Sequence, residues 1–219
     1  MIFSHTSPAY QWKLANAGVD RYNGARYYSE EIVRNIIPNV KTTRNWVTIN
    51  VEGCAFDHSV VFVHNNLKPE EVYDWLSVYD DLVLVCGVPE TVERVAHLGE
   101  AVYLPLSVDV HEVERYRRPK TKKTCYAGRI GKWRDRLPKG TDYIAALPRD
   151  EFLSRLAEYE HAYAVGRSAI EARILGCEVL PYDDRFPDPS VWKVLDNRDA
   201  AAMLQKVLDG IDGEMEAAS

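Results

Sequence analysis

The sequence predicts an α/β fold made of two small Rossmann-like domains, each built on a mostly parallel sheet. Short runs rich in β-branched residues alternate with segments whose apolar residues recur at helical spacing, which is the pattern of βαβ units. The alternation is interrupted once, by the polar and densely charged stretch 110–123. We therefore expect an N-terminal domain over 1–109, a linker over 110–123 and a C-terminal domain over 124–219.

The N-terminal half alternates between apolar runs and amphipathic stripes. Strands are expected at the short apolar runs 46–51, 60–64, 82–86 and 101–104. Helices are expected at 26–37, 68–79 and 89–98. Pro38 ends the first of these stripes, because proline cannot continue a helix, and Pro69 and Pro89 stand where a helix start tolerates proline.

The C-terminal half repeats this alternation without repeating the sequence. Strands are expected at 124–127, 143–147, 161–165 and 178–182. Helices are expected at 149–159, 168–175 and 198–211. Gly176 follows the second helix, where glycine commonly ends a helix in a left-handed conformation.

Composition narrows the classes of function. The net charge of −6 and the pI near 5.6 argue against broad, non-specific binding of nucleic acid. A local basic segment between Arg115 and Lys139 leaves contact with an acidic partner open, although a solvated linker face is the simpler interpretation. No window approaches 18 apolar residues, and no basic segment precedes an apolar run at the N-terminus. We expect a soluble, cytoplasmic protein without a membrane span.

Cysteines and histidines show no metal-binding pattern. The four cysteines are widely spaced, with no C-x-x-C pair, which is typical of small buried hydrophobic residues rather than of zinc ligands or disulfides. The six histidines lack the spacing of metal ligands, and there is no Asp-x-Asp motif. The sequence therefore predicts no metal site.

The candidate ligand site lies at the carboxyl ends of the predicted strands, where parallel sheets bind their ligands. Gly166-Arg167-Ser168 forms a turn into a helix, so its backbone N–H groups can face a phosphate, and Glu171 lies close enough for a sugar hydroxyl. Gly128-Arg129 ends another strand, and His64 ends a strand of the first half. Each also has a structural interpretation: an ordinary turn with a solvated arginine, a carboxylate favoured by the helix dipole, and a structural histidine.

Four short motifs occur in an order found in a known family. They are Gly24–Val33, the segment Leu104–Asp109, the strand end Tyr126-Ala127-Gly128-Arg129, and Glu171-Ala172 followed by Gly176 and Glu178-Val179-Leu180. This series resembles the GT-B fold glycosyltransferases, especially the retaining family 4 type, in a shortened form. The resemblance implies two Rossmann-like domains that face each other across a cleft, with the acceptor on the N-terminal side.

The resemblance also implies an activity and a set of site residues. A sugar would pass from a nucleotide-diphospho-sugar to an acceptor, without a metal or a cofactor besides the donor. Arg129, with Lys132 or Arg134, would face the diphosphate, and Glu171 would hold the ribose. The candidate catalytic residues are His64, Arg129 and Glu171. The candidate donor-binding residues are Gly24, Gly128, Arg129, Lys132, Arg134, Gly166, Arg167, Ser168 and Glu171.

Departures from the family pattern favour alternatives. Tyr163 stands where the family usually has a second glutamate, and Arg134 stands in place of its usual lysine. A non-catalytic nucleotide or nucleotide-sugar binding protein of the same fold would fit Tyr163. A DNA-modifying glycosyltransferase would suit the small size but not the acidic charge. A Rossmann dehydrogenase is disfavoured, because no strand is followed by G-x-G-x-x-G.

Overall fold

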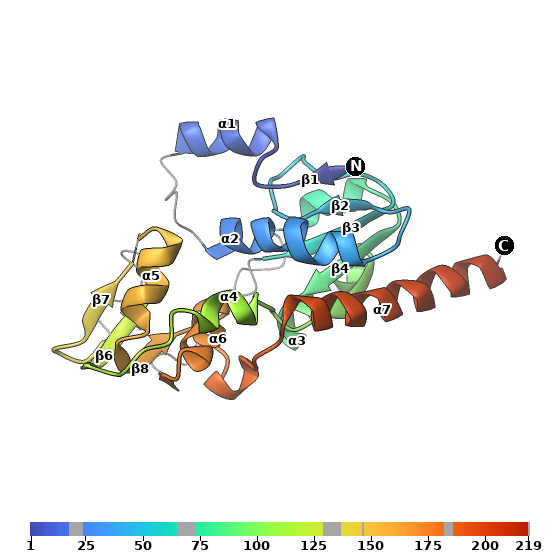
Figure 1. Ribbon diagram of the computed structural model, residues 1–219. Helices are drawn as coiled ribbons and strands as arrows, with labels where there is room; N and C mark the ends of the chain where they lie inside the picture. The colour runs from blue at the N-terminus through green and yellow to red at the C-terminus, as the bar shows by residue number, and fades with distance from the viewer. Residues whose placement is uncertain (18–23, 65–72, 129–136, 146, 182–185, 219) are drawn as a thin grey trace. The chain divides into compact units, whose positions relative to one another are not determined.

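The computed structural model describes residues 1–17, 24–64, 73–128, 137–145, 147–181 and 186–218. Contacts divide the chain into two compact units (Figure 1). Unit 1 comprises Met1–Val19, Tyr28–Pro105 and Asn197–Ser219, and unit 2 comprises Asp20–Tyr27 and Leu106–Asp196. The last helix thus groups with the first unit, whereas the sequence-based division assigned it to the C-terminal half.

Unit 1 is built on a five-stranded parallel sheet. The strands are β1 (Ile2–Phe3), β2 (Asn45–Val47), β3 (Ser59–Val63), β4 (Leu82–Cys86) and β5 (Glu100–Tyr103). They lie side by side in sequence order, β1-β2-β3-β4-β5. The predicted strands at 60–64, 82–86 and 101–104 are confirmed to within a residue or two, and the strand predicted at 46–51 is shorter than expected.

The helices of unit 1 depart from the predictions in several places. They are α1 (Pro8–Ala17), α2 (Gly24–Glu31), the π-helix η1 (Ile32–Ile36), the 3-10 helices η2 (Ile37–Asn39), η4 (Asp74–Val78) and η5 (Ala96–Leu98), α3 (Pro89–Val95) and α7 (Asn197–Ala218). The helix predicted at 26–37 is present, but its later turns widen and then tighten before the chain leaves the helix. Of the helix predicted at 68–79, residues 68–72 lie outside the described residues, and only a 3-10 segment follows.

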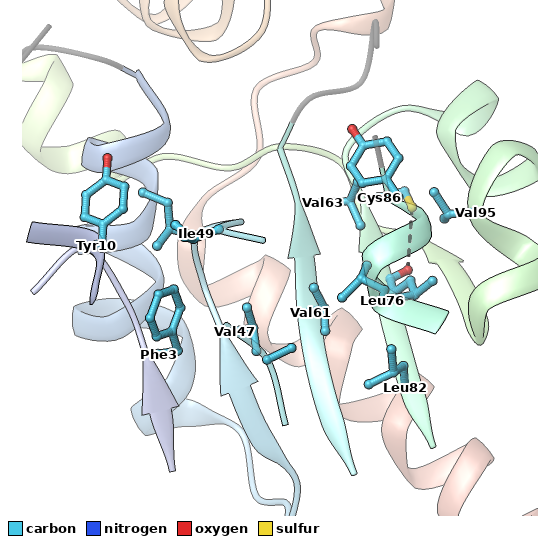
Figure 2. Packing of buried hydrophobic residues seen from close by; sticks show 14 residues of the cluster. Phe3, Tyr10, Val47, Ile49, Val61, Val63, Leu76, Leu82, Cys86 and Val95 are labelled. Atoms are coloured by element: carbon cyan, nitrogen blue, oxygen red, sulfur yellow. Dashed lines mark hydrogen bonds between the residues drawn. The ribbon is translucent and has the colours of Figure 1, made fainter. Parts of the chain in front are cut away.

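One face of the unit 1 sheet carries a continuous apolar core (Figure 2). Alternate residues of a strand point to the same face. Phe3, Val47, Val61, Leu84 and other residues of this face therefore pack with the helices that cover it. Those helices contribute Tyr10 of α1, Leu76 of η4 and Val95 of α3.

The opposite face of the same sheet is also covered. Tyr28 of α2 meets Phe62 of β3 edge-on, with ring centroids 6.1 Å apart, and Trp46 stacks on Phe62 at 6.4 Å. Helix α7 packs against η1 and buries Leu204 and Leu208. Helices on both faces explain why β3 and β4 read as continuous apolar runs.

A buried arginine ties α7 to the amino edge of the unit 1 sheet. Arg44, whose side chain is fully buried, donates to Asp81 at 2.7 Å and to Asp212 of α7 at 2.9 Å. His58 bonds the other oxygen of Asp81 at 2.5 Å. Burial alone would raise the pKa of Asp81, but the bonds from His58 and Arg44 and their charges outweigh it, so this pKa lies below its usual value.

Unit 2 is built on a four-stranded parallel sheet in the order β7-β6-β8-β9. Its strands are β6 (Lys122–Ala127), β7 (Asp142–Ile144), β8 (Tyr159–Ala164) and β9 (Glu178–Leu180). Its helices are α4 (Val110–Glu114), α5 (Arg149–Leu156), α6 (Arg167–Ile174) and the 3-10 helix η7 (Pro189–Val191). The prediction of an α/β fold with two parallel sheets is thus confirmed.

Much of the stretch predicted as a linker has regular structure and defined contacts. Helix α4 begins after Asp109, whose side chain accepts the N–H of Glu112. Lys120 donates to the carbonyls of Ala157 and Leu175, which stand just after α5 and α6. These contacts satisfy carbonyl groups that a helix end leaves without a partner, so Lys120 serves the fold of unit 2. The other basic residues of the stretch are exposed, as predicted: Arg115, Arg117, Arg118, Lys122 and Lys123.

The described cysteines are all free thiols, as the sequence predicts. Cys86, Cys125 and Cys177 are buried, and burial raises the pKa of each of the three. Within the described ranges, no helix has both the length and the apolar character needed to traverse a bilayer.

Candidate functional site

The strand order of unit 2 creates a reversal at β6 and β8. These two strands are neighbours, yet β6 is followed in the chain by β7 on one side, and β8 is followed by β9 on the other. The connections that leave their carboxyl ends therefore diverge. Ligands of open α/β sheets bind at such a reversal, which directs attention to Gly128 after β6 and to Gly166 after β8.

Gly166 is the turn between β8 and α6, and its backbone conformation requires glycine. Its φ of +61° and ψ of −136° lie in a region that side chains with a Cβ strongly disfavour. Space is not the constraint, because an added Cβ would lie 3.6 Å from Leu106 Cδ1. No side chain caps the start of α6, so its first N–H groups are suited to bind an anion.

Two arginines share one buried carboxylate beside this turn. Arg167, the first residue of α6, lies 3.4 Å through Nη2 from Oε1 of Glu171, one turn further along the helix. Arg149, the first residue of α5, donates through Nη1 to the same oxygen at 2.5 Å. The three side chains are only 15% (Arg149), 7% (Arg167) and 3% (Glu171) exposed. The cluster therefore concentrates charge in a desolvated place, where electrostatic interactions are strong.

Arg149 has two further neighbours that extend the cluster. Its guanidinium carbon lies 5.7 Å from the ring centre of Tyr27, which is a cation–π distance. Its Nε lies 3.9 Å from Oε1 of Glu112, on the helix that Asp109 caps. Two residues from motifs matched in the sequence, Tyr27 and Asp109, thus belong to or support the surroundings of Glu171.

Gly128 is required for a different reason. A Cβ at this position would lie 2.3 Å from the ring of Tyr126, which stacks on Tyr143 with centroids 4.9 Å apart. A side chain at Gly128 would have to displace the Tyr126 ring from its stack, so this packing favours glycine as the chain leaves β6. The predicted diphosphate ligands that follow, Arg129, Lys132 and Arg134, lie outside the described residues.

The remaining predicted residues of this site occupy less distinctive positions. Ser168 is the second residue of α6 and is half-buried, and Gly24 is the exposed first residue of α2, where an added Cβ would meet open space. Tyr163, where the resembling family has a glutamate, is half-buried on β8 beside Tyr126 and Leu180 of the neighbouring strands.

His64 directly follows β3 at the carboxyl edge of the unit 1 sheet and is held by the segment that follows β2. Its Nε2 lies 2.5 Å from the carbonyl oxygen of Thr48, so this nitrogen carries the proton. Its backbone N–H donates to Asn50 Oδ1 at 2.9 Å, and its ring meets Tyr28 edge-on at 5.5 Å. The tautomer assigned in this way makes Nδ1 the basic atom of neutral His64.

Arg149 is the site residue that sequence reasoning did not select. The turn Leu147-Pro148-Arg149 stands at a predicted strand end, but an arginine at the start of a helix next to an Asp-Glu pair is typical of a solvated surface. Only its contact with Glu171, 22 positions later, reveals its burial. The available signal was its position after β7, on the same sheet edge as Gly128 and Gly166.

Two titratable groups beside the unit 2 sheet have raised pKa values. Burial, together with a hydrogen bond to Asp142, raises the pKa of Tyr159. The hydrogen bond from Tyr116 to Asp150, and then burial, raise the pKa of Tyr116. Both phenols therefore stay protonated near neutral pH and act there as donors.

Among the residues that the structure describes, no three His, Cys, Asp or Glu side chains are placed to hold a metal ion. Comparison with models of protein families, with curated proteins and with solved structures found no match for this chain.

Proposed function

We propose that this chain is a glycosyltransferase that binds a nucleotide-diphospho-sugar at the carboxyl ends of β6 and β8 in unit 2. The observation that carries the proposal is the pair of arginines, Arg149 and Arg167, which converge on Glu171 beside the glycine turn at Gly166. Guanidinium groups and an uncapped helix start are suited to a diphosphate. A buried carboxylate one helical turn away is suited to ribose hydroxyls.

In the proposed reaction, the bond between the anomeric carbon and the diphosphate oxygen breaks, and its electron pair leaves with the diphosphate. A new bond forms from the acceptor hydroxyl oxygen to the same carbon, and the hydroxyl proton passes to a base. Arg149, Arg167 and the first N–H groups of α6 would stabilise the charge that grows on the leaving group. Arg129, with Lys132 or Arg134, is assigned the same role from the sequence.

His64 is proposed to contact the acceptor or the donor sugar from unit 1. Its support is the fixed tautomer: because Nε2 donates to the Thr48 carbonyl, Nδ1 can accept a hydrogen bond or a proton. A neutral imidazole can accept a proton in general acid–base catalysis.

The second candidate is a nucleotide or nucleotide-sugar binding protein of the same fold without turnover. It is favoured by Tyr163, a phenol on β8 where the resembling family has a carboxylate. The cluster around Glu171 is common to both candidates, so donor binding is expected in either case, and only turnover separates them.

The test of donor binding compares two arginines of the same helix. Calorimetry or thermal shift would measure binding of uridine, guanosine and adenosine diphosphates and of their sugars. A ligand at 100 times its dissociation constant stabilises the folded protein by about 2.7 kcal/mol. We expect Arg167→Gln to weaken binding by at least about tenfold, since charge-assisted bonds contribute about 1.5–3 kcal/mol. Arg173→Gln is the control, because Arg173 is exposed and bonds the Pro189 carbonyl.

Turnover is measured as release of nucleoside diphosphate from each sugar donor with a panel of hydroxyl acceptors. Release that depends on an acceptor supports the glycosyltransferase, whereas tight binding without release under every condition supports the second candidate. If no nucleotide binds to the wild-type protein, both candidates fall.

A further inference from the structure

We propose that Glu171 and the diphosphate compete for the same two guanidinium groups, so that donor binding transfers Arg149 and Arg167 from the carboxylate to the phosphates. This inference rests on the proposed function and concerns how its site selects a nucleotide over other polyphosphates. As a consequence, Glu171 lowers the affinity for diphosphates that carry no ribose.

Arg149 and Arg167 contact the same oxygen of Glu171. Oε1 of Glu171 accepts a hydrogen bond from Nη1 of Arg149 at 2.5 Å and lies at an ion-pair distance of 3.4 Å from Nη2 of Arg167. The two arginines therefore share the single negative charge of this carboxylate, although they begin different helices, α5 and α6. Glu112, 3.9 Å from Nε of Arg149, supplies a weaker second negative charge.

The charged groups of this cluster are buried, so each of them needs a partner. The Glu171 side chain is almost fully buried, and both arginines are mostly buried. A buried charge needs a partner of opposite sign, and removing one partner of such a pair is strongly unfavourable. Each guanidinium must therefore keep an anion beside it, and Glu171 must keep a donor beside it.

A diphosphate bound by the two arginines would be repelled by the Glu171 carboxylate. An anion bound by Arg149 and Arg167 would stand next to the Glu171 carboxylate, and like charges at such short range repel each other. The repulsion is relieved when the arginines turn to the phosphates and the carboxylate turns away. Glu171 then has a buried acceptor oxygen without its former donors.

The loss of the arginine partners makes Glu171 selective for ligands that carry a ribose. In a nucleoside diphosphate, the ribose carries hydroxyl donors that can bond the released carboxylate. Inorganic pyrophosphate carries none, so its binding leaves Glu171 buried without a donor. Discrimination that depends on an otherwise unsatisfied buried group is large. Glu171 thus couples recognition of the sugar to recognition of the phosphates.

The experiment measures dissociation constants by titration calorimetry for pyrophosphate and for uridine, guanosine and adenosine diphosphates. The decisive quantity is the ratio of the pyrophosphate constant to that of the best nucleoside diphosphate. We expect Glu171→Gln to bind pyrophosphate at least about tenfold tighter than the wild type, with little or no gain for the nucleotide, so the ratio falls by about tenfold or more, equivalent to about 1.4 kcal/mol. Glu112→Gln is the matched control on Arg149, and its ratio should stay within about threefold of the wild type.

A folded Glu171→Gln variant whose ratio equals that of the wild type overturns the competition, while nucleotide binding by the wild type leaves the proposed function standing. If Glu171→Gln does not fold, Glu171→Asp replaces it, because the shorter side chain keeps the charge but withdraws it from Arg149. Its ratio should also fall, and an unchanged ratio overturns the inference. If the wild-type protein binds none of the three nucleotides, the proposed function falls and the competition falls with it.

Discussion

Gly166→Ala isolates the contribution of a backbone conformation, because it adds one methyl group to a turn that has room for it. The φ of +61° and ψ of −136° at this position lie outside the regions that alanine adopts readily. The added Cβ would make an ordinary contact with Leu106 Cδ1 at 3.6 Å. The cost must therefore come from backbone strain and not from a clash.

The expected destabilisation is the difference between two opposing effects. Holding a residue with a Cβ in such a region costs about 1–3 kcal/mol. Alanine also has fewer conformations than glycine in the unfolded chain, which favours folding by about 0.4–1 kcal/mol. The middle of the two ranges gives a net loss of about 1.3 kcal/mol, which lowers the melting temperature of a chain of this size by about 3–5 °C.

Differential scanning calorimetry of Gly166→Ala and of a matched variant tests this reasoning. Gly210→Ala makes the same chemical change inside α7, where nothing lies within 4 Å of the added Cβ, and should raise stability by about 1 kcal/mol. The two variants should therefore shift in opposite directions. A melting temperature for Gly166→Ala equal to or above that of the wild type would refute the assigned strain.

Three further predictions concern other parts of the fold. Asp81→Asn should lower the free energy of unfolding by about 1–2 kcal/mol at pH 7, since it removes a charged partner of buried Arg44. The loss is moderate because Asp81 itself is a third exposed, and solvent weakens the ion pair. Because bonds to Asp81 hold its pKa below the ordinary 3.8, its contribution is present above that pH and disappears as pH falls through the lowered value. Urea titrations of both proteins should therefore converge as the pH falls below the lowered pKa of Asp81. Burial raises the pKa of Cys86 to about 12, so a thiol reagent at pH 8 should label the partly exposed Cys54 first and Cys86 only after unfolding, as read by mass spectrometry. Asp109→Ala should cost about 1 kcal/mol in denaturant titrations through loss of the α4 cap, and Asp109→Asn should restore most of it.

Sequence patterns predicted the buried strands β3 and β4 to within one residue. β4 is a run of five apolar residues, and β3 holds four apolar residues after Ser59. Both strands are wholly buried, so apolar composition and burial agree. The strand predicted at 46–51 ends at Val47. Ile49 and Val51 are buried as expected, but in a segment that does not pair with a strand. Apolar composition indicates burial there but not sheet pairing. The N-terminal helix α1 went unpredicted because its apolar residues do not form a clear stripe.

Long-range pairing limited what the sequence could reveal about the candidate site. Gly166 was selected because a glycine turn has a local signature. Glu171 was selected as a carboxylate of the first helical turn, but the first turn of α6 holds no acidic residue and Glu171 lies one turn further on. Arg149 was not selected, because its role depends on a contact across 22 residues. For the same reason the assignment of α7 was missed: Arg44 and Asp212 are 168 positions apart, and no local pattern links them.

The two sheets differ in a way that favours unit 2 as the place of the ligand. In unit 1 the strands follow one another in sequence order, so consecutive connections advance across the sheet in one direction and no pair of strand ends diverges. His64 and Asn50 at its carboxyl edge use their polar groups to join β2 and β3. In unit 2 the order reverses at β6 and β8, and each of these strands ends in a glycine that the local geometry requires, Gly128 and Gly166. Open α/β sheets bind their ligands at such a reversal, and Arg149, Arg167 and Glu171 converge beside its β8 end. The proposed diphosphate site rests on this coincidence.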